Sequence, residues 1–404
     1  MVDVRPFVAL CPPPAHAAEV ASVPYDVINS EEARALAKGR ERSFLHVIRP
    51  EIDLPPGTDL YSDAVYAKGR ENLERWIADL PYTDLGGPVF FVYRLVQDGW
   101  SQTGVVGGCS VDEYDAGLIA IHERTRQDKE DDRTRHVTEM RCQAEPIFLV
   151  YRSSTSVGSV IDRTVTQPPH VDFEAMDGVR HTLWVVQETE ELIHAFEGVP
   201  QLYVADGHHR TKSASRARAA IAEREGGLSE DAACNRVMSV LFPDDQMRIL
   251  SYNRVVSDLG GRSPEEVLEA LAARVDLIPT DSSVPDRRRC FAVYGAGAWH
   301  RFTLSPAREE LPSSLDVSLL QDQVLAPLFG IADPRTDQRI EFVGGSRGTE
   351  ELERRADATG GIAFSLSPTS LSDLFDVADA GEIMPPKSTW FEPKLRSGLF
   401  LYRI

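Results

Sequence analysis

The sequence contains few cysteines, and they are not arranged as a metal site or a disulfide framework. Five cysteines occur among 404 residues. They are scattered along the chain, and no two of them form a CxxC pair. A zinc ribbon and a disulfide-stapled fold are therefore not expected, and a reducing compartment is.

Long apolar runs are also missing. No stretch approaches the roughly 20 apolar residues that a membrane span requires. The first residues, 1–6, show neither the basic flank nor the apolar core of a signal peptide. We therefore expect a cytoplasmic protein that does not bind membranes.

Positive charge is in short supply. The chain has 43 Lys and Arg against 63 Asp and Glu, which gives a formal net charge of −20. Nucleic acid is an unlikely partner for such a chain, because neutralisation of phosphates by basic residues supplies most of the affinity for DNA and RNA. A small anionic substrate stays compatible with this charge, since a few clustered arginines can override the global field. Nothing in the sequence indicates an oligomeric state.

The pattern of apolar residues predicts a mixed α/β fold in three regions. Residues 1–103 are expected to form an αβ scaffold, 104–258 a catalytic core, and 259–404 a C-terminal αβ region. In the scaffold, the apolar run 44–48 predicts a short strand that ends before a proline. In the last region, Ser263 and the acidic residues after it predict a capped helix start.

The sharpest local signal is the turn from Asp206 to Arg210. The apolar run 201–205 predicts a strand that delivers Asp206 to its carboxyl edge, where open α/β sheets bind ligands. His208, His209 and Arg210 would then open a helix, whose N-terminus favours anions. The alternative is that Asp206 merely caps this helix and the histidines are polar surface.

A second candidate is Glu123 with the charged run 123–136 that it opens. If the run were helical from its start, Glu123, Arg126, Glu130 and Arg133 would lie along one face. Glu123 could then act as a base while the arginines hold a charged substrate. The alternative is a solvated helix of surface salt bridges, which is what most charge runs are.

Metal binding is expected through oxygen ligands. His208 and His209 are adjacent, about 100° apart on a helix, so they do not readily share one ion, and a histidine zinc site is disfavoured. A carboxylate such as Asp206 or Glu123 suits Mg²⁺ that is held jointly with substrate phosphates. No GxxxxGK[ST] loop and no protein-kinase HRD or DFG motif is present.

The closing segment 384–394 adds Lys387, Ser388 and Thr389 between prolines and aromatic residues. Small hydroxyl groups and lysines could surround a phosphate, and a packed C-terminal staple is the equally weighted alternative. Arg254, at the end of an expected strand, is a further candidate for the same pocket.

Five phrases of the sequence resemble those of one bacterial and archaeal domain-of-unknown-function family, in the same order and over nearly the full length. They read VPYDV, HERTR, KEDDR, DGHHR and MPPKST, at residues 23–27, 122–126, 129–133, 206–210 and 384–389. The DGHHR turn is similar to that of the free serine kinases, which have a ParB/sulfiredoxin-like core and convert L-serine to O-phosphoserine. Some members of the full-length family are thought to be serine kinases that use pyrophosphate.

The resemblance implies phosphoryl transfer, magnesium and a mixed α/β core with a ParB/sulfiredoxin-like centre and elaborations at both ends. Carried over by motif, Glu123 matches the catalytic carboxylate, and the turn that begins at Asp206 handles the phosphate. The predicted function is a small-molecule kinase that phosphorylates free L-serine from pyrophosphate or a nucleotide. A phosphohydrolase with the same site, or a ParB-like nucleotide-binding module without transfer, are the alternatives.

The roles of the individual residues follow from this prediction. Glu123 would accept the proton of the serine hydroxyl, and Asp206 would bind Mg²⁺ or orient a histidine. Two histidines, His208 and His209, complete the catalytic group. Six further residues hold the substrate and the phosphates: Arg126, Arg133, Arg210, Lys387, Ser388 and Thr389. If they form one site, Glu123, Asp206, His208 and Arg210 must line one concave pocket, with Lys387 or Lys394 at its rim.

Overall fold

The computed structural model describes residues 2–80 and 82–404, which fold into two compact units. Unit 1 consists of Met1–Ile121, Thr125–Met247 and Pro393–Ile404, and unit 2 of His122–Arg124 and Arg248–Glu392. The structure thus divides the chain differently from the three predicted regions. Strand β5 (Trp100–Ser110) runs across the predicted boundary at 103/104, so residues on both sides of it share one sheet.

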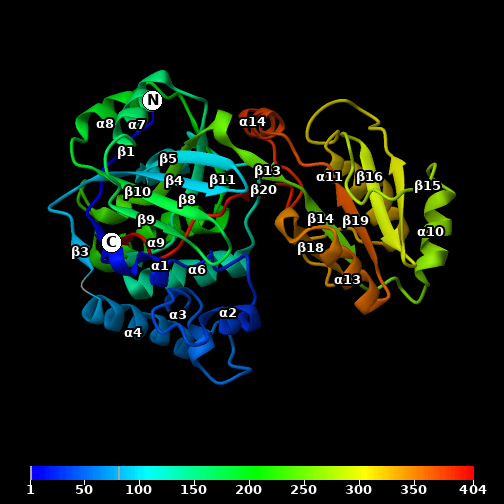
Figure 1. Ribbon diagram of the computed structural model, residues 1–404, viewed down its shortest axis with the longest axis horizontal. Coiled ribbons are helices and arrows are strands. Elements are labelled where there is room, and N and C mark those ends of the chain that lie inside the picture. The colour runs from blue at the N-terminus through cyan, green and yellow to red at the C-terminus, as the bar shows by residue number, and fades with distance from the viewer. Residues whose placement is uncertain (1, 81) are drawn as a thin grey trace. The chain divides into compact units, whose positions relative to one another are not determined.

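Unit 1 is built on a nine-stranded mixed sheet (Figure 1). Its strands lie in the order β6 (Ile119–Ala120), β11 (Leu202–Asp206), β8 (Ile147–Tyr151), β12 (Arg236–Pro243), β5, β4 (Phe90–Gln97), β10 (Arg180–Val186) and β9 (Val171–Glu174), and β1 (Val4–Arg5) pairs with β5. The pairs β8–β12 and β6–β11 are parallel and the other pairs are antiparallel. Every residue of β8 is buried, as its uninterrupted apolar sequence requires.

Helices pack around this sheet. Apolar side chains of α7 and α8 join the core beneath the strands, α6 packs against α9, and α4 packs against α6. The helices of unit 1 are α1 (Ala17–Val20), α2 (Ser30–Ala37), α3 (Leu45–Ile48), α4 (Asp63–Asp79), α5 (Val111–Asp115), α6 (Gln127–Met140), α7 (Thr155–Thr164), α8 (Glu190–Glu197) and α9 (His208–Glu225), with 3-10 turns at Pro14–His16, Pro50–Asp53, Ala233–Asn235 and Asp244–Gln246.

One prediction for unit 1 is wrong, and the condition of another, that the charged run is helical from its start, is not met. Residues 44–48, predicted as a strand, contain the helix α3, whose apolar side chains are buried against Trp76 of α4 and its neighbours. A short apolar run does not by itself distinguish a strand from a buried helical turn. The charged run is helical only from Gln127, so Glu123 and Arg126 precede α6 and do not lie on one helical face with Arg133.

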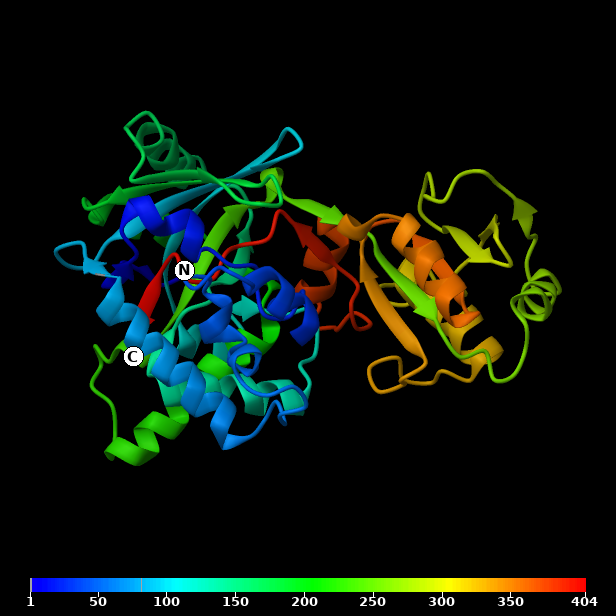
Figure 2. The ribbon, with the colours of Figure 1, turned by 60° about the horizontal axis from the view of Figure 1, so that its bottom comes forward.

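A small second sheet joins the two ends of the chain within unit 1. Its strand order is β3 (Thr83–Asp84), β2 (Ala9–Cys11), β21 (Leu401–Arg403) and β7 (Cys142–Gln143). Figure 2 shows the C-terminal strand, in red, inside this unit among the blue N-terminal segments. The last twelve residues, which begin with Pro393 and Lys394, therefore belong to unit 1.

Unit 2 contains a six-stranded antiparallel sheet and a two-stranded one. The larger sheet has the order β15 (Ile278–Pro279), β17 (Ala298–Thr303), β16 (Cys290–Gly295), β19 (Ile362–Leu366), β14 (Tyr252–Val256) and β18 (Ile340–Gly344), and in the smaller one β13 (Arg248–Leu250) pairs with β20 (Trp390–Glu392). The helices are α10 (Pro264–Ala272), α11 (Asp316–Leu320), α12 (Ala326–Phe329), α13 (Glu350–Thr359) and α14 (Leu371–Asp379), with a π-helical turn, η5 (Gln321–Leu325), and a 3-10 turn at Gly345–Arg347.

One local sequence signal predicted for unit 2, a helix cap, is present in the structure. Ser263 caps α10 and Glu266 completes the capping box, as predicted. Strands and helices in both units, with mixed strand pairing in unit 1, confirm the predicted mixed α/β fold class.

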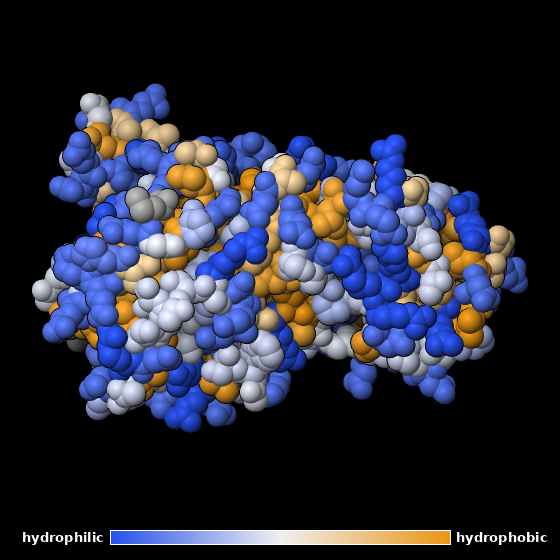
Figure 3. Space-filling model, turned by 90° about the horizontal axis from the view of Figure 1, so that it is seen from above, coloured by the Kyte–Doolittle hydropathy of each residue, from blue (hydrophilic) through white to orange (hydrophobic). Residues whose placement is uncertain are grey.

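The surface is largely polar. Figure 3 shows a face on which hydrophilic residues dominate and apolar residues are scattered among them. Of the helices in the described part of the chain, none combines the length and apolar character that crossing a bilayer demands.

Candidate functional site

The turn that follows β11 is shaped around a glycine. Gly207 has φ 98° and is the N-cap of α9. A Cβ atom at this position would lie 3.1 Å from Cζ of Arg210, so both the backbone conformation and the close approach of the guanidinium require glycine. Gly207, and not Asp206, occupies the N-cap position of α9, and a glycine has no side chain that could cap the helix.

Asp206 pairs instead with two cations of unit 1. Its Oδ2 lies 3.0 Å from Nζ of Lys394, and its Oδ1 lies 3.9 Å from a terminal nitrogen of Arg210. Lys394 is only 9% exposed, although it was predicted at the rim of a pocket. A lysine and an arginine thus converge on one carboxylate at the start of an 18-residue helix.

Arg210 itself is held inside unit 1. Its Nη1 donates a hydrogen bond to the carbonyl oxygen of Pro146. Burial acts to lower the pKa of Arg210, but the carboxylates of Asp26, Asp206 and Glu145 outweigh it, and the pKa lies above its usual value. The guanidinium therefore stays charged at any pH at which the protein is folded.

The two histidines of the turn differ in exposure. His208 is buried, whereas His209 is partly exposed and its Nε2 accepts a hydrogen bond from the backbone N–H of Arg126 at 3.1 Å. Because Nε2 is the acceptor, a neutral His209 carries its proton on Nδ1. The start of α6 is thereby tied to the start of α9. The side chain of Arg126 is exposed and pairs with Asp128 at 2.9 Å.

Arg133 lies in an internal ionic cluster. It contacts Asp132 at 2.8 Å and Glu145 at 3.6 Å, and its Cζ lies 4.2 Å from the centre of the Tyr25 ring. Burial raises the pKa of Glu145, and the positive charges of Arg133 and Arg210 oppose that rise. A cavity of about 30 Å³ between these side chains has room for roughly one water molecule. The VPYDV, KEDDR and DGHHR phrases thus meet in one buried cluster.

Glu123 belongs to unit 2 and is anchored by the closing segment. Its Oε2 accepts a hydrogen bond from the backbone N–H of Lys387 at 3.3 Å. The carbonyl oxygen of His122 accepts one from Met384 at 2.8 Å, and Nε2 of His122 lies 3.2 Å from Oγ1 of Thr389. The HERTR and MPPKST phrases are therefore neighbours in space.

A buried arginine holds this arrangement in place. Arg254 donates hydrogen bonds to the carbonyl oxygens of Lys387, at 3.0 Å, and of Tyr252. Its Cζ lies 4.6 Å from the centre of the Phe342 ring. Burial lowers the pKa of Arg254 to about 10, against the opposing influence of Tyr252 and Glu123. This arginine, expected as a pocket residue, binds the backbone of the MPPKST segment.

The other residues of that segment are placed as follows. Ser388 is 2% exposed and donates to the carbonyl oxygen of Pro385 at 2.6 Å, which makes its hydroxyl part of the turn. Lys387 has φ 57°, and its ammonium lies 5.6 Å from the centre of the Tyr252 ring.

The predicted site residues thus fall into two groups, one in each unit. Unit 1 holds Arg126, Arg133, Asp206, His208, His209 and Arg210, and unit 2 holds Glu123, Lys387, Ser388 and Thr389. The prediction that Glu123 and the Asp206–Arg210 turn share one pocket concerns both units and stays a prediction.

A resident metal ion has little support from these groups. No three His, Cys, Asp or Glu side chains come together as a metal site in residues 2–80 and 82–404. The carboxylate of Asp206 is already paired with Lys394. The residues fit magnesium only in the form in which phosphate oxygens supply most of its ligands and Asp206 supplies one.

Sequence reasoning did not identify Glu145, Asp26 or Lys394 as partners of the turn. Glu145 and Asp26 influence the charge of Arg210, and Lys394 binds Asp206 across 188 residues of sequence. The local signal of its burial was that Glu145 lies between Ala144 and the apolar strand that follows Pro146.

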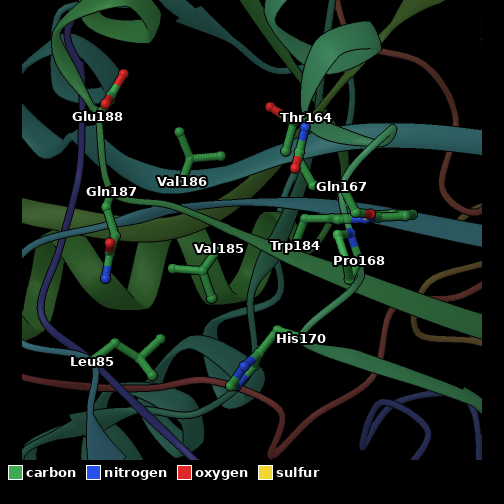
Figure 4. A pocket seen from close by; sticks show the side chains of 10 residues that line it. All are labelled: Leu85, Thr164, Gln167, Pro168, His170, Trp184, Val185, Val186, Gln187 and Glu188. Carbon is green, nitrogen blue, oxygen red and sulfur yellow. The ribbon is translucent and has the colours of Figure 1, made fainter.

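A separate pocket of about 800 Å³ opens in unit 1 (Figure 4). Its lining includes Thr164, Gln167, His170, Trp184, Gln187 and Glu188. None of the predicted site residues lines it.

Several solved structures resemble the chain at low sequence identity. A free serine kinase in complex with AMP is 15% identical, with 71% of this chain and 86% of that chain covered and a TM-score of 0.36. A C-terminally truncated SbnI from Staphylococcus aureus is 15% identical, with 71% and 82% covered and a TM-score of 0.38. A conserved hypothetical protein from Pyrococcus furiosus is 14% identical, with 73% and 93% covered and a TM-score of 0.36.

No curated protein matches the sequence. The model of one family, described as a protein of unknown function (DUF1015), matches residues 4–318. The resemblance predicted from the five phrases is thereby confirmed, and the chain belongs to the DUF1015 family.

Proposed function

We propose that the protein is a phosphotransferase that moves a phosphoryl group from pyrophosphate or a nucleotide to the hydroxyl of free L-serine. The observation that carries the proposal is the convergence of Lys394 and Arg210 on Asp206 at the start of α9. A helix N-terminus with two buried cations beside it suits a phosphate group. Phosphoryl transfer depends mainly on such positioning and charge stabilisation.

On the donor side, the proposed phosphate ligands are Lys394, His208, His209 and the first turn of α9. Gly207 supports this role because its φ of 98° suits glycine, and a Cβ atom there would crowd the Arg210 guanidinium at 3.1 Å. Asp206 orients the ammonium of Lys394 through their 3.0 Å contact. Arg133 and Arg210 act from inside unit 1, as fixed positive charges behind the turn.

On the acceptor side, we assign the base role to Glu123. Its carboxylate is positioned through Oε2 by a backbone N–H, and that backbone is in turn held by Arg254. In this role Glu123 accepts the proton of the serine hydroxyl as the new O–P bond forms and the donor's bridging P–O bond breaks. Lys387 and Thr389, on the segment that anchors Glu123, are proposed to contact the transferred phosphate.

Magnesium enters the proposal with the donor. A Mg²⁺ ion bound by donor phosphates would neutralise their charge, and Asp206 is the residue of the turn that offers it an oxygen ligand. The hydrogen bond from Lys394 to Asp206 would then compete with the metal for one carboxylate oxygen.

The decisive experiment supplies the full chain with magnesium, L-serine and, separately, pyrophosphate, ADP and ATP, and follows O-phosphoserine by mass spectrometry. The matched control is Glu123→Gln, which keeps the size of the side chain and removes the carboxylate. O-phosphoserine from the wild-type chain and not from the variant supports the proposal. Absence of O-phosphoserine with all three donors refutes it, and donor consumption that is indifferent to added amino acids identifies a phosphohydrolase instead.

A further inference from the structure

Unit 2 contains a pocket of about 690 Å³ beside Glu123. Its lining includes Arg124, the turn from Gln321 and Asp322, and the segment Met384–Pro386. Arg124 directly follows Glu123 in the chain, and Pro386 precedes Lys387, whose N–H binds the Glu123 carboxylate at 3.3 Å. Two of the lining segments therefore also carry the proposed base and its anchor.

Charges of both signs in this pocket lack protein partners. Arg124 is exposed and forms no ion pair with any residue in the described ranges, and the same holds for Asp322 and Glu382. Arg335, a second cation of the lining, is already paired with Asp333 at 2.8 Å. A ligand that carries one anionic and one cationic group would complete both sets.

The turn that carries Asp322 is itself unusual. Residues Gln321–Leu325 form a π-helical turn, a conformation that is rare and often occurs at functional sites. The Nε2 of Gln321 donates to the carbonyl oxygen of Ile331 at 2.7 Å, whereas its Oε1 is buried and has no hydrogen-bond partner in the described part of the structure. The Nε2 hydrogen bond fixes the turn that carries Asp322, and the enclosed oxygen lies out of reach of a ligand.

The composition of the pocket argues against a nucleotide or pyrophosphate. Two arginines face three acidic residues, Asp322, Asp333 and Glu382. None of the described lining residues is aromatic, so the pocket offers no stacking surface for a base.

We propose that this pocket binds the acceptor as a free amino-acid zwitterion. Arg124 pairs with the α-carboxylate, and the acidic pair Asp322 and Glu382 receives the α-ammonium. This inference rests on the proposed function, because it adds the acceptor site to that reaction. The required chemistry is ordinary, since a guanidinium matches a carboxylate with two parallel hydrogen bonds.

The test compares Arg124→Gln and Asp322→Asn with the wild-type chain in steady-state kinetics. Each variant should raise the KM for L-serine at least tenfold and leave the KM for the phosphate donor unchanged. The matched control is Arg301→Gln, which removes an exposed arginine of β17 that does not line the pocket. If O-phosphoserine is formed with the same serine KM in Arg124→Gln and wild type, the pocket assignment is overturned while the proposed function stands.

A direct binding measurement tests the pocket assignment independently of the proposed kinase activity. Titration calorimetry of the full chain with L-serine, ethanolamine and N-acetyl-L-serine needs no turnover. The pocket assignment expects L-serine to bind wild type more tightly than either analogue, since each analogue lacks one charge, and expects that binding to be lost in Arg124→Gln. Serine binding that is absent from wild type, or unchanged in the variant, overturns the assignment whether or not the protein is a kinase.

Discussion

The two units hold their candidate carboxylates in different ways. In unit 1, Asp206 lies between side-chain cations, with Lys394 at 3.0 Å and Arg210 at 3.9 Å. In unit 2, Glu123 accepts a hydrogen bond from a neutral backbone group at 3.3 Å. Two side-chain cations contact Asp206, whereas a backbone N–H positions Glu123 and the charge of Arg254 acts on it as well. The comparison assigns charge handling to Asp206, and the base role of Glu123 stays a proposal.

The largest effect is expected for Glu123→Gln, which tests the role of the carboxylate in unit 2. If Glu123 is the base, turnover should fall about 10²–10⁴-fold, which is the usual contribution of a general base. Donor affinity should stay within a few-fold of wild type, because the variant leaves unit 1 untouched. Steady-state kinetics and calorimetry with the donor measure the two quantities. An equal loss in both would show that Glu123 serves binding and not proton transfer.

The corresponding variant in unit 1 is Lys394→Met, which tests the pair of Lys394 and Asp206. Removing this buried ammonium takes away the cation that lies 3.0 Å from Asp206, and we expect the free energy of unfolding to fall by about 3 kcal/mol. Donor affinity should fall as well, while L-serine binding stays unchanged. The double variant Lys394→Met/Asp206→Asn should recover part of the stability, because it no longer leaves the Asp206 carboxylate without its lysine. Chemical denaturation of the wild type, the two single variants Lys394→Met and Asp206→Asn, and the double variant measures this. If the losses of unfolding free energy in the single variants simply add up in the double variant, the two side chains do not form a direct pair.

Unit 1 should lose stability in acid. His136 of α6 is buried with Nε2 at 3.1 Å from the carbonyl oxygen of Val47. Burial and the nearby charge of Arg133 lower its pKa from 6.5 to about 3, with Asp132 opposing. The unfolded state therefore binds a proton before the folded state does, as the pH falls below 6.5. This histidine's stabilising contribution is complete above pH 6.5 and is lost between pH 6.5 and about 3, by about 1.4 kcal/mol per pH unit.

Hydrogen exchange at pH 7 and pH 5 would detect this difference. Protection of α6 and its neighbours should decrease at the lower pH, and His136→Gln, which keeps a donor for Val47, should flatten the pH dependence. A variant with the same pH dependence as the wild type would show that another group is responsible.

The smallest expected effect is that of Arg126→Ala. The side chain is exposed and, within residues 2–80 and 82–404, pairs only with Asp128, an arrangement that contributes less than about 1 kcal/mol. The backbone N–H that binds His209 is retained by alanine. We therefore expect near-normal stability, and a change in donor KM well below that of Lys394→Met. A large rise in donor KM would return Arg126 to the phosphate-binding group.

Much of the local structure followed from neighbouring residues in the sequence. The strand that ends at Asp206, the glycine after it and the helix that begins at His208 were predicted because their signals lie within a few residues of one another. The capping box of Ser263 and Glu266 is local in the same sense. The order of the motifs was also sufficient to predict the family.

Charge placement was decided by the tertiary structure. Arg126 and Arg133 come from the same charge run, yet one is exposed and the other is 6% exposed and stacked on Tyr25. Asp206 and Lys394 are 188 residues apart in sequence, and Glu123 and Lys387 are 264 apart. The sequence by itself determined which residues carry charge and which turns and helices they begin. Only the folded chain determined which charges are buried together, because burial depends on packing between segments that no local pattern encodes.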